Sequence, residues 1–379
     1  MKAALTAARF IVGILFIFSG LVKANDPLGL SYKMQEFFEV WGWGFLDNFA
    51  LSFSILMIAF EIIAGVAVLL GWRMKLFSWL LLLLIVFFTF LTGYAVFSGK
   101  IRTCGCFGDC IPLTAEQSFT KDLVLTALIV FIFIFRNQVQ PLFRPLISGR
   151  ILILTTLFSF ALQGYVFRHL PIVDCLPYKV GKNIQQQMKV PPGAIADSTV
   201  ITFVYDKQGK QVEFTSDNFP DDFDDSLYHF VRRYDKLVRK GNAEPAIRDF
   251  ALTSLSGNDS TQAILGQQGY AVYVFAKDQV NADYNREENK QLRTILDYAK
   301  SKEMPVYIIT NTKEVLSELA SATRDTALTA TNAFLCDAVA IKTAARANPT
   351  LYLLKDGVVQ NKWAYADIKK TLTQIQQLK

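Results

Sequence analysis

Long apolar runs alternate with short polar segments over roughly the first 170 residues. The apolar runs fall at about 5 to 22, 49 to 71, 76 to 97, 120 to 136 and 150 to 168. A helix needs about 20 apolar residues to cross a hydrocarbon core of roughly 30 Å. The pattern therefore predicts five transmembrane helices. The fourth is the shortest, and the first is retained because no clean cleavage site follows it.

After Lys179 the pattern becomes that of a water-soluble chain, with frequent charged and amide residues. Two alternating stretches around Gly209 predict a hairpin. Apolar positions from Phe223 to Val238 recur at helical spacing and predict a charged helix that Gly241 ends. The expected units are a four-helix transmembrane domain at 1–136, a fifth transmembrane helix at 150–168, a tether with the hairpin and the charged helix at 169–243, and a soluble domain at 244–379.

Basic residues in the short loops set the expected orientation. With the N-terminus in the cytoplasm, the inner segments carry Arg73, Lys75, Arg136, Arg144 and Arg150 with few acids. Five spans then place the C-terminal domain outside. We expect a multi-pass inner-membrane protein whose first partner is the lipid bilayer. The net charge of +6 is spread thinly along the chain, so we expect no nucleic-acid partner.

In this topology all five cysteines lie on the outer side, where disulfides persist. Cys104, Cys106 and Cys110 form a CxCxxxC loop before the fourth helix. A thiol pair there could exchange electrons, since exchange needs an attacking thiolate and a resolving partner. The alternatives are an inert disulfide, for instance Cys104 or Cys106 with Cys110, and a metal site. Three thiolates leave a zinc site one ligand short, and His169 is the residue that could complete it.

Two further cysteines and one buried acid are candidates. Cys175 follows the fifth helix on the same side as the loop, and it could pair with a loop cysteine and tie the tether down. Cys336 lies in a strand-like segment and is expected to be an inert spare thiol. Glu61 lies near the middle of the second span, where acids usually face the bundle interior. It is either a proton acceptor, a polar partner for Lys23, or a protonated packing residue.

Residues 1–136 resemble the DoxX-like and methylamine-utilisation MauE families of four-helix membrane proteins. The segments FSGLVKANDPLGLSYK, EIIAGVAVLLGW and CGCFGDC carry the resemblance, in the expected order. These families are regarded as redox-associated. The loop's placement is also similar to that in quinone-reducing disulfide-forming enzymes and the vitamin K epoxide reductase family, although their CxxC is absent. The resemblance implies a quinone as a possible cofactor, and no metal is assigned.

A second resemblance begins at Glu244 and points to TlpA-like and peroxiredoxin-like thioredoxin folds. YAVYVFA is expected as a central strand, NKQLRTILDYAKSKEM as a helix, PVYIIT as the next strand and NPTLYLLKDGVVQNKWA as a closing hairpin. Pro349 matches the cis-proline position of thioredoxins. No cysteine stands where those proteins carry CxxC. This α/β domain is therefore expected to bind partners at its Pro349 edge by strand addition.

The leading hypothesis is a redox-associated membrane protein that passes electrons through the CxCxxxC loop to a quinone or a partner protein. Its partner would be an envelope redox protein or a client polypeptide. The rival is a non-enzymatic assembly or scaffolding protein braced by disulfides, and metal handling is a third interpretation. Because the chemistry of the loop is open at this stage, the sequence alone leaves enzyme activity undecided.

Overall fold

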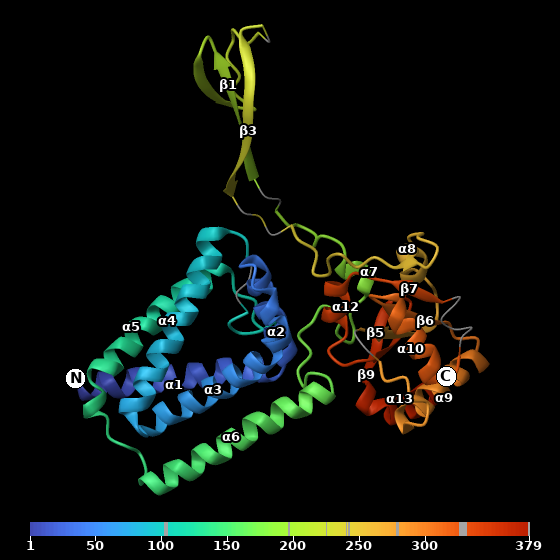
Figure 1. Cartoon of the computed structure of the whole chain (residues 1–379), viewed down its shortest axis with the longest axis horizontal. Helices are drawn as coiled ribbons and strands as arrows, with labels where there is room; N and C mark the ends of the chain where they lie inside the picture. The colour runs from blue at the N-terminus through green and yellow to red at the C-terminus, as the bar shows by residue number, and fades with distance from the viewer. Residues whose placement is uncertain are drawn as a thin grey trace.

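The structure is a computed structural model, and it describes all of the chain except residues 102–104, 196–197, 225, 240, 242, 278–279, 326–331 and 378–379. An α-helical bundle comes first, and an α/β domain follows beyond one of its ends (Figure 1). The fold class predicted from the sequence is thus confirmed, as a membrane bundle joined to an α/β domain.

Five helices are long and apolar enough to cross a membrane, as predicted. They are α1 (Lys2–Ala24), α3 (Ala50–Leu70) with the short helix η1 (Gly44–Phe49) before it, α4 (Met74–Ser98), α5 (Ala115–Ile134) with η2 (Arg136–Gln138) after it, and α6 (Pro145–Arg168). The fourth span begins earlier than the apolar run suggests. Thr114 and Gln117 form a capping box, which starts α5 at Ala115.

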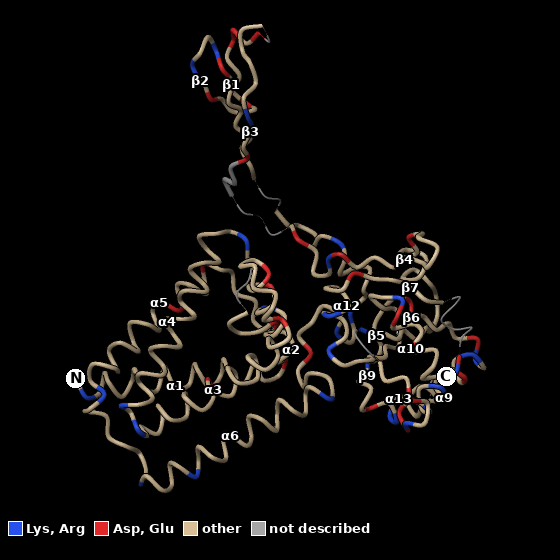
Figure 2. The backbone as a smooth tube through the Cα atoms, viewed as in Figure 1, with Lys and Arg blue, Asp and Glu red and all other residues tan. Residues whose placement is uncertain are grey.

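The bundle is held together by apolar packing inside and by close helix contacts. Val12 of α1, Val68 of α3 and Leu81 of α4 belong to one buried cluster. Gly13 and Gly65 let α1 and α3 approach closely, because a Cβ on either glycine would meet backbone oxygen of the other within about 3.0 Å. Figure 2 shows the long uncharged stretches of these helices, in contrast to the many charges on the α/β domain.

A short helix that the hydropathy pattern does not predict follows α1. Helix α2 (Pro27–Val40) begins with Asp26 as its N-cap, whose carboxylate accepts a hydrogen bond from Gly29 N at 3.0 Å. Pro27 occupies the first helical position, where proline is favoured. This Asp-Pro pair is the signal that could have predicted α2 from the sequence.

The tether leads through α7 (Ile184–Gln187) to a separate three-stranded sheet in the order β2-β1-β3, which projects away from the rest (Figure 1). Its strands are β1 (Ser198–Lys207), β2 (Lys210–Thr215) and β3 (Tyr228–Arg239). The hairpin around Gly209 is present. The prediction of a charged helix is wrong, because β3 forms in that segment and pairs antiparallel with β1.

The reason lies in the partner that β1 provides. Tyr228, Phe230 and Tyr234 fit a two-residue alternation as well as a helical spacing, so the local pattern is ambiguous. Pairing with β1 satisfies the backbone groups of both strands, and Tyr205 packs against Phe230 with ring centroids 5.6 Å apart. Contacts across the sheet therefore override the weak helical preference.

The C-terminal α/β domain contains a six-stranded sheet in the order β4-β7-β6-β5-β8-β9. Its strands are β4 (Thr253–Ser254), β5 (Tyr270–Ala276), β6 (Val306–Thr310), β7 (Ala333–Leu335), β8 (Thr350–Lys355) and β9 (Val358–Ala364). The helices are α8 (Thr261–Leu265), α9 (Glu287–Ser301), α10 (Lys313–Thr323), α12 (Ala338–Ala344), η3 (Tyr365–Asp367) and α13 (Ile368–Gln376).

Strand β5 is central, parallel to β6 and antiparallel to β8, with Val274 opposite both Ile308 and Leu351. Separate apolar clusters cover the two faces of the sheet. The peptide bond between Asn348 and Pro349 is cis. The expected strands, the helix after β5, the closing hairpin and the cis-proline are thus all present, and they support the likeness to thioredoxins.

Candidate functional site

The end of the bundle that carries the cysteine loop contains a buried ion pair. Lys23, at the end of α1, contacts Glu61 of α3, and their side chains are 2% and 1% exposed. Ser19 Oγ donates to Glu61 Oε2 at 3.2 Å and approaches Cys106 O at 3.0 Å. Of the three roles open for Glu61, the structure shows the contact with Lys23, and Ser19 links that pair to the loop.

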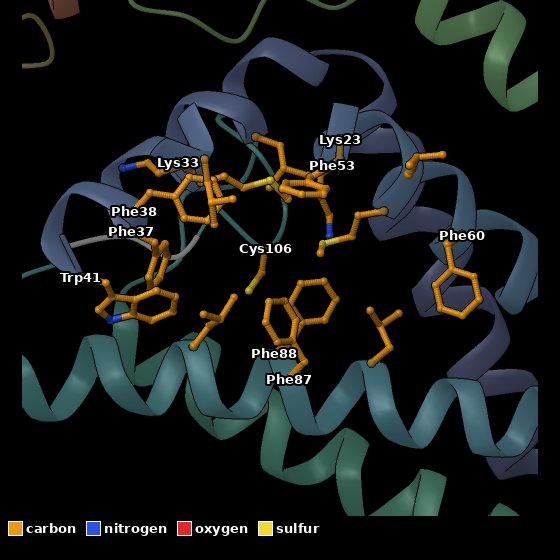
Figure 3. Close-up of a pocket in the computed structure, with 18 residues that line it drawn as sticks. Lys23, Lys33, Phe37, Phe38, Trp41, Phe53, Phe60, Phe87, Phe88 and Cys106 are labelled. Carbon is orange, nitrogen blue, oxygen red and sulfur yellow. The ribbon is translucent and has the colours of Figure 1, made fainter. Parts of the chain in front are cut away.

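Cys106 is buried and lies beside a large apolar cavity of about 480 Å³. Figure 3 shows Cys106 near Phe37 of α2, Trp41 at the end of that helix, and the rings of Phe87 and Phe88 from α4. Lys23 and Lys33 are the charged residues in this lining. The arrangement places a sulfur atom and a buried ammonium group at the wall of a cavity that suits a flat apolar ligand.

A second, small cavity of about 30 Å³ is also lined by Cys106. Its lining shares Lys23, Phe88 and Cys106 with the large cavity, and it adds the charged residues Glu61, Lys121 and Asp122. A space of this size holds about one water molecule when polar groups surround it. Cys106 thus lines both the large apolar cavity and a small one that charged side chains reach.

Asp122 forms a second buried ion pair in the bundle, one that the sequence analysis did not single out. Its carboxylate contacts Lys121 Nζ at 2.5 Å and accepts a hydrogen bond from Thr92 Oγ1 at 3.1 Å. The Asp122 side chain is 1% exposed, whereas that of Lys121 is 24% exposed. An acidic residue inside a predicted membrane span is the sequence signal that could have identified it.

The cysteines of the loop have different surroundings. Cys110 forms a disulfide with Cys175, so the structure brings these two predicted residues together and excludes Cys110 as a partner of Cys104 or Cys106 in this state. Cys104 lies outside the described residues. Cys336 is a buried free thiol, and burial raises its pKa to about 12, so little thiolate forms near neutral pH.

His169, the residue that could complete a metal site, contacts the α/β domain. Nδ1 of His169, the proposed fourth ligand, lies 2.6 Å from Asp367 Oδ2 of the α/β domain, and its ring stacks on Tyr165. Among the described residues, which leave out Cys104, no group of three or more His, Cys, Asp and Glu side chains is placed to hold a metal ion.

Pro349 lies in the part of the α/β domain that faces the bundle. It is buried, and Asn348 before it accepts a hydrogen bond from Lys277 N at 2.9 Å. Lys277 follows β5, near the place where a thioredoxin carries CxxC, and its Nζ lies 2.5 Å from Tyr32 OH of α2. The segment around the cis-proline is therefore close to the chain's own membrane unit. The sequence analysis expects a partner to bind at this edge.

Comparison with known proteins agrees with the membrane part of this description. Residues 1–135 match the family described as methylamine utilisation protein MauE. Residues 199–240, which cover most of the projecting sheet, match a domain of unknown function (DUF8463).

The protein TlpB of Flavobacterium psychrophilum is 29% identical to the chain over 128 residues, which make up 33% of this chain and 35% of that protein. The chain thus matches about a third of this relative's length. No solved structure matches the chain. Residues 1–135 thus form a MauE-like, multi-pass membrane domain.

Proposed function

We propose that this MauE-like membrane protein transfers electrons between cysteines of its CxCxxxC loop and a membrane quinone. The observation that carries the proposal is the position of Cys106 at the wall shared by the large apolar cavity and the Lys23–Glu61 ion pair. Sulfur, a protonatable pair and space for a flat ring are the elements that such a transfer needs.

The large cavity supplies the proposed quinone site. Its rim residues Phe53, Leu56 and Phe87 are exposed on the surface of the bundle that would face lipid, so an isoprenoid tail can enter from the bilayer. The lining is apolar apart from Lys23, Lys33 and Cys106. Near the ring, the Lys23 ammonium group would stabilise the negative charge that a quinone gains on reduction.

The proposed step is balanced. Two loop thiols lose two electrons and two protons and form a disulfide, while the quinone takes up both and becomes a quinol. Cys106 supplies one thiol, and either Cys104 or Cys110 is the resolving cysteine. Glu61 accepts a thiol proton while Lys23 orients its carboxylate. In this proposal the five spans place the loop on the periplasmic side of the inner membrane, where an envelope redox protein or a client polypeptide is its protein partner.

The test uses the whole protein in lipid nanodiscs. After reduction, the protein is mixed with a short-chain benzoquinone or naphthoquinone, quinol formation is followed by absorbance, and each thiol is mapped by alkylation and mass spectrometry. Cys106→Ser should abolish quinol formation, whereas Cys336→Ser, which changes a thiol buried in the α/β domain, should react as the unmodified protein does.

Wild-type rates in both Cys106→Ser and Cys110→Ser would reject electron transfer. A non-enzymatic assembly role would then be favoured, because the Cys110–Cys175 disulfide already ties the loop to the tether. In that case the disulfide should stay oxidised under mild reductant and show no response to quinone.

A further inference from the structure

Both cysteines of the Cys110–Cys175 disulfide follow an aspartate, and each aspartate contacts a different buried cation of the α/β domain. Arg346 Nη2 lies 2.9 Å from Asp109 Oδ2, and Lys362 Nζ lies 2.5 Å from Asp174 Oδ2. The side chains of Arg346 and Lys362 are 5% and 6% exposed. Cations of the α/β domain thus contact the residue before each cysteine of the disulfide.

Arg346 also reaches the N-terminus of α2. Its Nε lies 2.7 Å from Asp26 Oδ2, and Asp26 caps α2 through Gly29. Although burial acts to lower the pKa of the Arg346 guanidinium, the carboxylates of Asp26 and Asp109 raise that pKa overall. One arginine therefore connects the first turn of α2 with the cysteine loop.

Tyr32 of α2 forms the centre of the same contact. Lys277, Lys342 and Arg346 each lie over its ring, at 5.2, 5.3 and 5.3 Å from the centroid. Three cations of the α/β domain, one just after β5 and two at the end of α12, thus surround one tyrosine of the membrane unit. We call the surface formed by Lys277, Lys342, Arg346 and Lys362, beside cis-Pro349, the cationic face.

We propose that the cationic face is a docking surface whose partner is the acidic, disulfide-bonded end of the chain's own membrane unit. The partner is defined by its chemistry: two Asp-Cys pairs joined by a disulfide, together with the Tyr32 ring and the Asp26 carboxylate. Strand addition at Pro349 is not needed for this recognition, because side-chain charges and the aromatic ring provide the contacts.

Docking and the disulfide are coupled in this arrangement. The disulfide holds Asp109 and Asp174 near each other, so Arg346 and Lys362 can contact both at once. Reduction adds two electrons and two protons from a dithiol and leaves two separate thiols, which frees the two aspartates to move apart. Because linkage is reciprocal, docking must stabilise the oxidised form to the same extent as the disulfide stabilises docking.

The first experiment measures this reciprocity without any quinone. The full-length protein in nanodiscs is equilibrated with dithiothreitol redox buffers, and the fraction of the Cys110–Cys175 disulfide is determined by alkylation and mass mapping. We expect Arg346→Gln to increase the equilibrium constant for reduction about tenfold, since removing one partner of a buried ion pair has a large effect. Lys290→Gln, which removes one charge from the exposed surface of α9, should leave it unchanged.

The second experiment measures docking by hydrogen exchange. It does not use the Arg346 variant, so misfolding of that variant cannot affect it. In the Cys110→Ser/Cys175→Ser protein, amide hydrogen exchange should rise at 27–33 and 338–347, while the strands β5 and β6 stay protected. Unchanged exchange at both segments, or a wild-type redox equilibrium in Arg346→Gln, would overturn the proposal. Neither result bears on Cys106, so the proposed electron transfer stands or falls separately.

Discussion

Buried charges occur in two regions around the cysteine loop, and the two regions differ in what can separate the charges. Inside the bundle, Lys23 contacts Glu61 and Lys121 contacts Asp122. At the cationic face, Arg346 and Lys362 contact aspartates of the loop and the tether. Each region has ions that are almost fully buried, Lys23, Glu61 and Asp122 in the first and Arg346 and Lys362 in the second, and leaving one of these unpaired would be costly.

Only the second region lies between two bodies that can move apart. The pairs inside the bundle connect helices or neighbouring residues that also pack through apolar contacts, so they cannot separate without disrupting the bundle. The pairs at the cationic face join a soluble domain to the membrane unit, and a rigid-body shift can expose both partners to water. The proposals above accordingly assign the Lys23–Glu61 pair to the chemistry at Cys106 and the pairs at the cationic face to domain docking.

The largest effect is expected where one inner ion loses its partner. Glu61→Ala leaves the Lys23 ammonium group buried and unpaired, which should destabilise the bundle by about 3–5 kcal/mol. Thermal unfolding in detergent measures this change. The Glu61→Ala/Lys23→Met double variant removes both charges and should recover most of the loss; no recovery would mean that the pair is not what stabilises this end of the bundle.

A smaller effect is expected at Tyr32, on the docking side of the comparison. Tyr32→Leu removes the hydrogen bond with Lys277 and the ring beneath three cations, and it should weaken docking by about 1–2 kcal/mol. Tyr32→Phe keeps the ring and serves as the control, so its loss should be smaller. Hydrogen exchange at 338–347 ranks the two; equal exchange in both variants would assign the contact to the hydroxyl alone.

The smallest effect concerns the pH dependence of stability at the contact between Asp367 of the α/β domain and His169 at the end of α6. Burial acts to raise the pKa of Asp367, but hydrogen bonds with Lys370 and His169 lower it overall. A carboxyl group with a lowered pKa in the folded state stabilises that state above its unfolded pKa, and the contribution is lost as the pH falls below about 4.

Asp367→Asn should therefore flatten the pH dependence of stability in this acid range by less than about 1 kcal/mol, because the site is partly exposed. Unfolding midpoints measured from pH 3 to pH 7 test this. An unaltered profile in the variant would show that the Asp367 carboxylate contributes nothing to stability in this pH range.

Much of the fold could be predicted because the signals for it are local. Hydropathy over about 20 residues identifies each span, and the alternation around Gly209 identifies the β1–β2 hairpin. The Asn348-Pro349 bond is cis as the resemblance implied. Segment 228–239 was assigned wrongly because its local pattern fits a helix and a strand alike, and only its pairing with β1 decides between them.

For the candidate site, too, the residue types could be predicted from the sequence but their arrangement could not. The chemical types at Cys106, Glu61 and Lys23 are visible in the sequence, because charged and thiol groups are conspicuous in or beside apolar spans. Their placement around two cavities depends on how α1, α3, α4 and the loop pack, and no local pattern gives that.

By itself, the sequence determined the five crossings, the α/β domain and the residues able to carry redox chemistry, because each depends on short-range hydropathy or on residue type. Only the tertiary structure decided that Cys110 pairs with Cys175 and that Asp122 lines the small cavity beside Cys106. It also decided that Arg346 contacts Asp26, which is 320 positions away in the sequence. Such contacts depend on the simultaneous position of distant segments, which no local sequence pattern encodes.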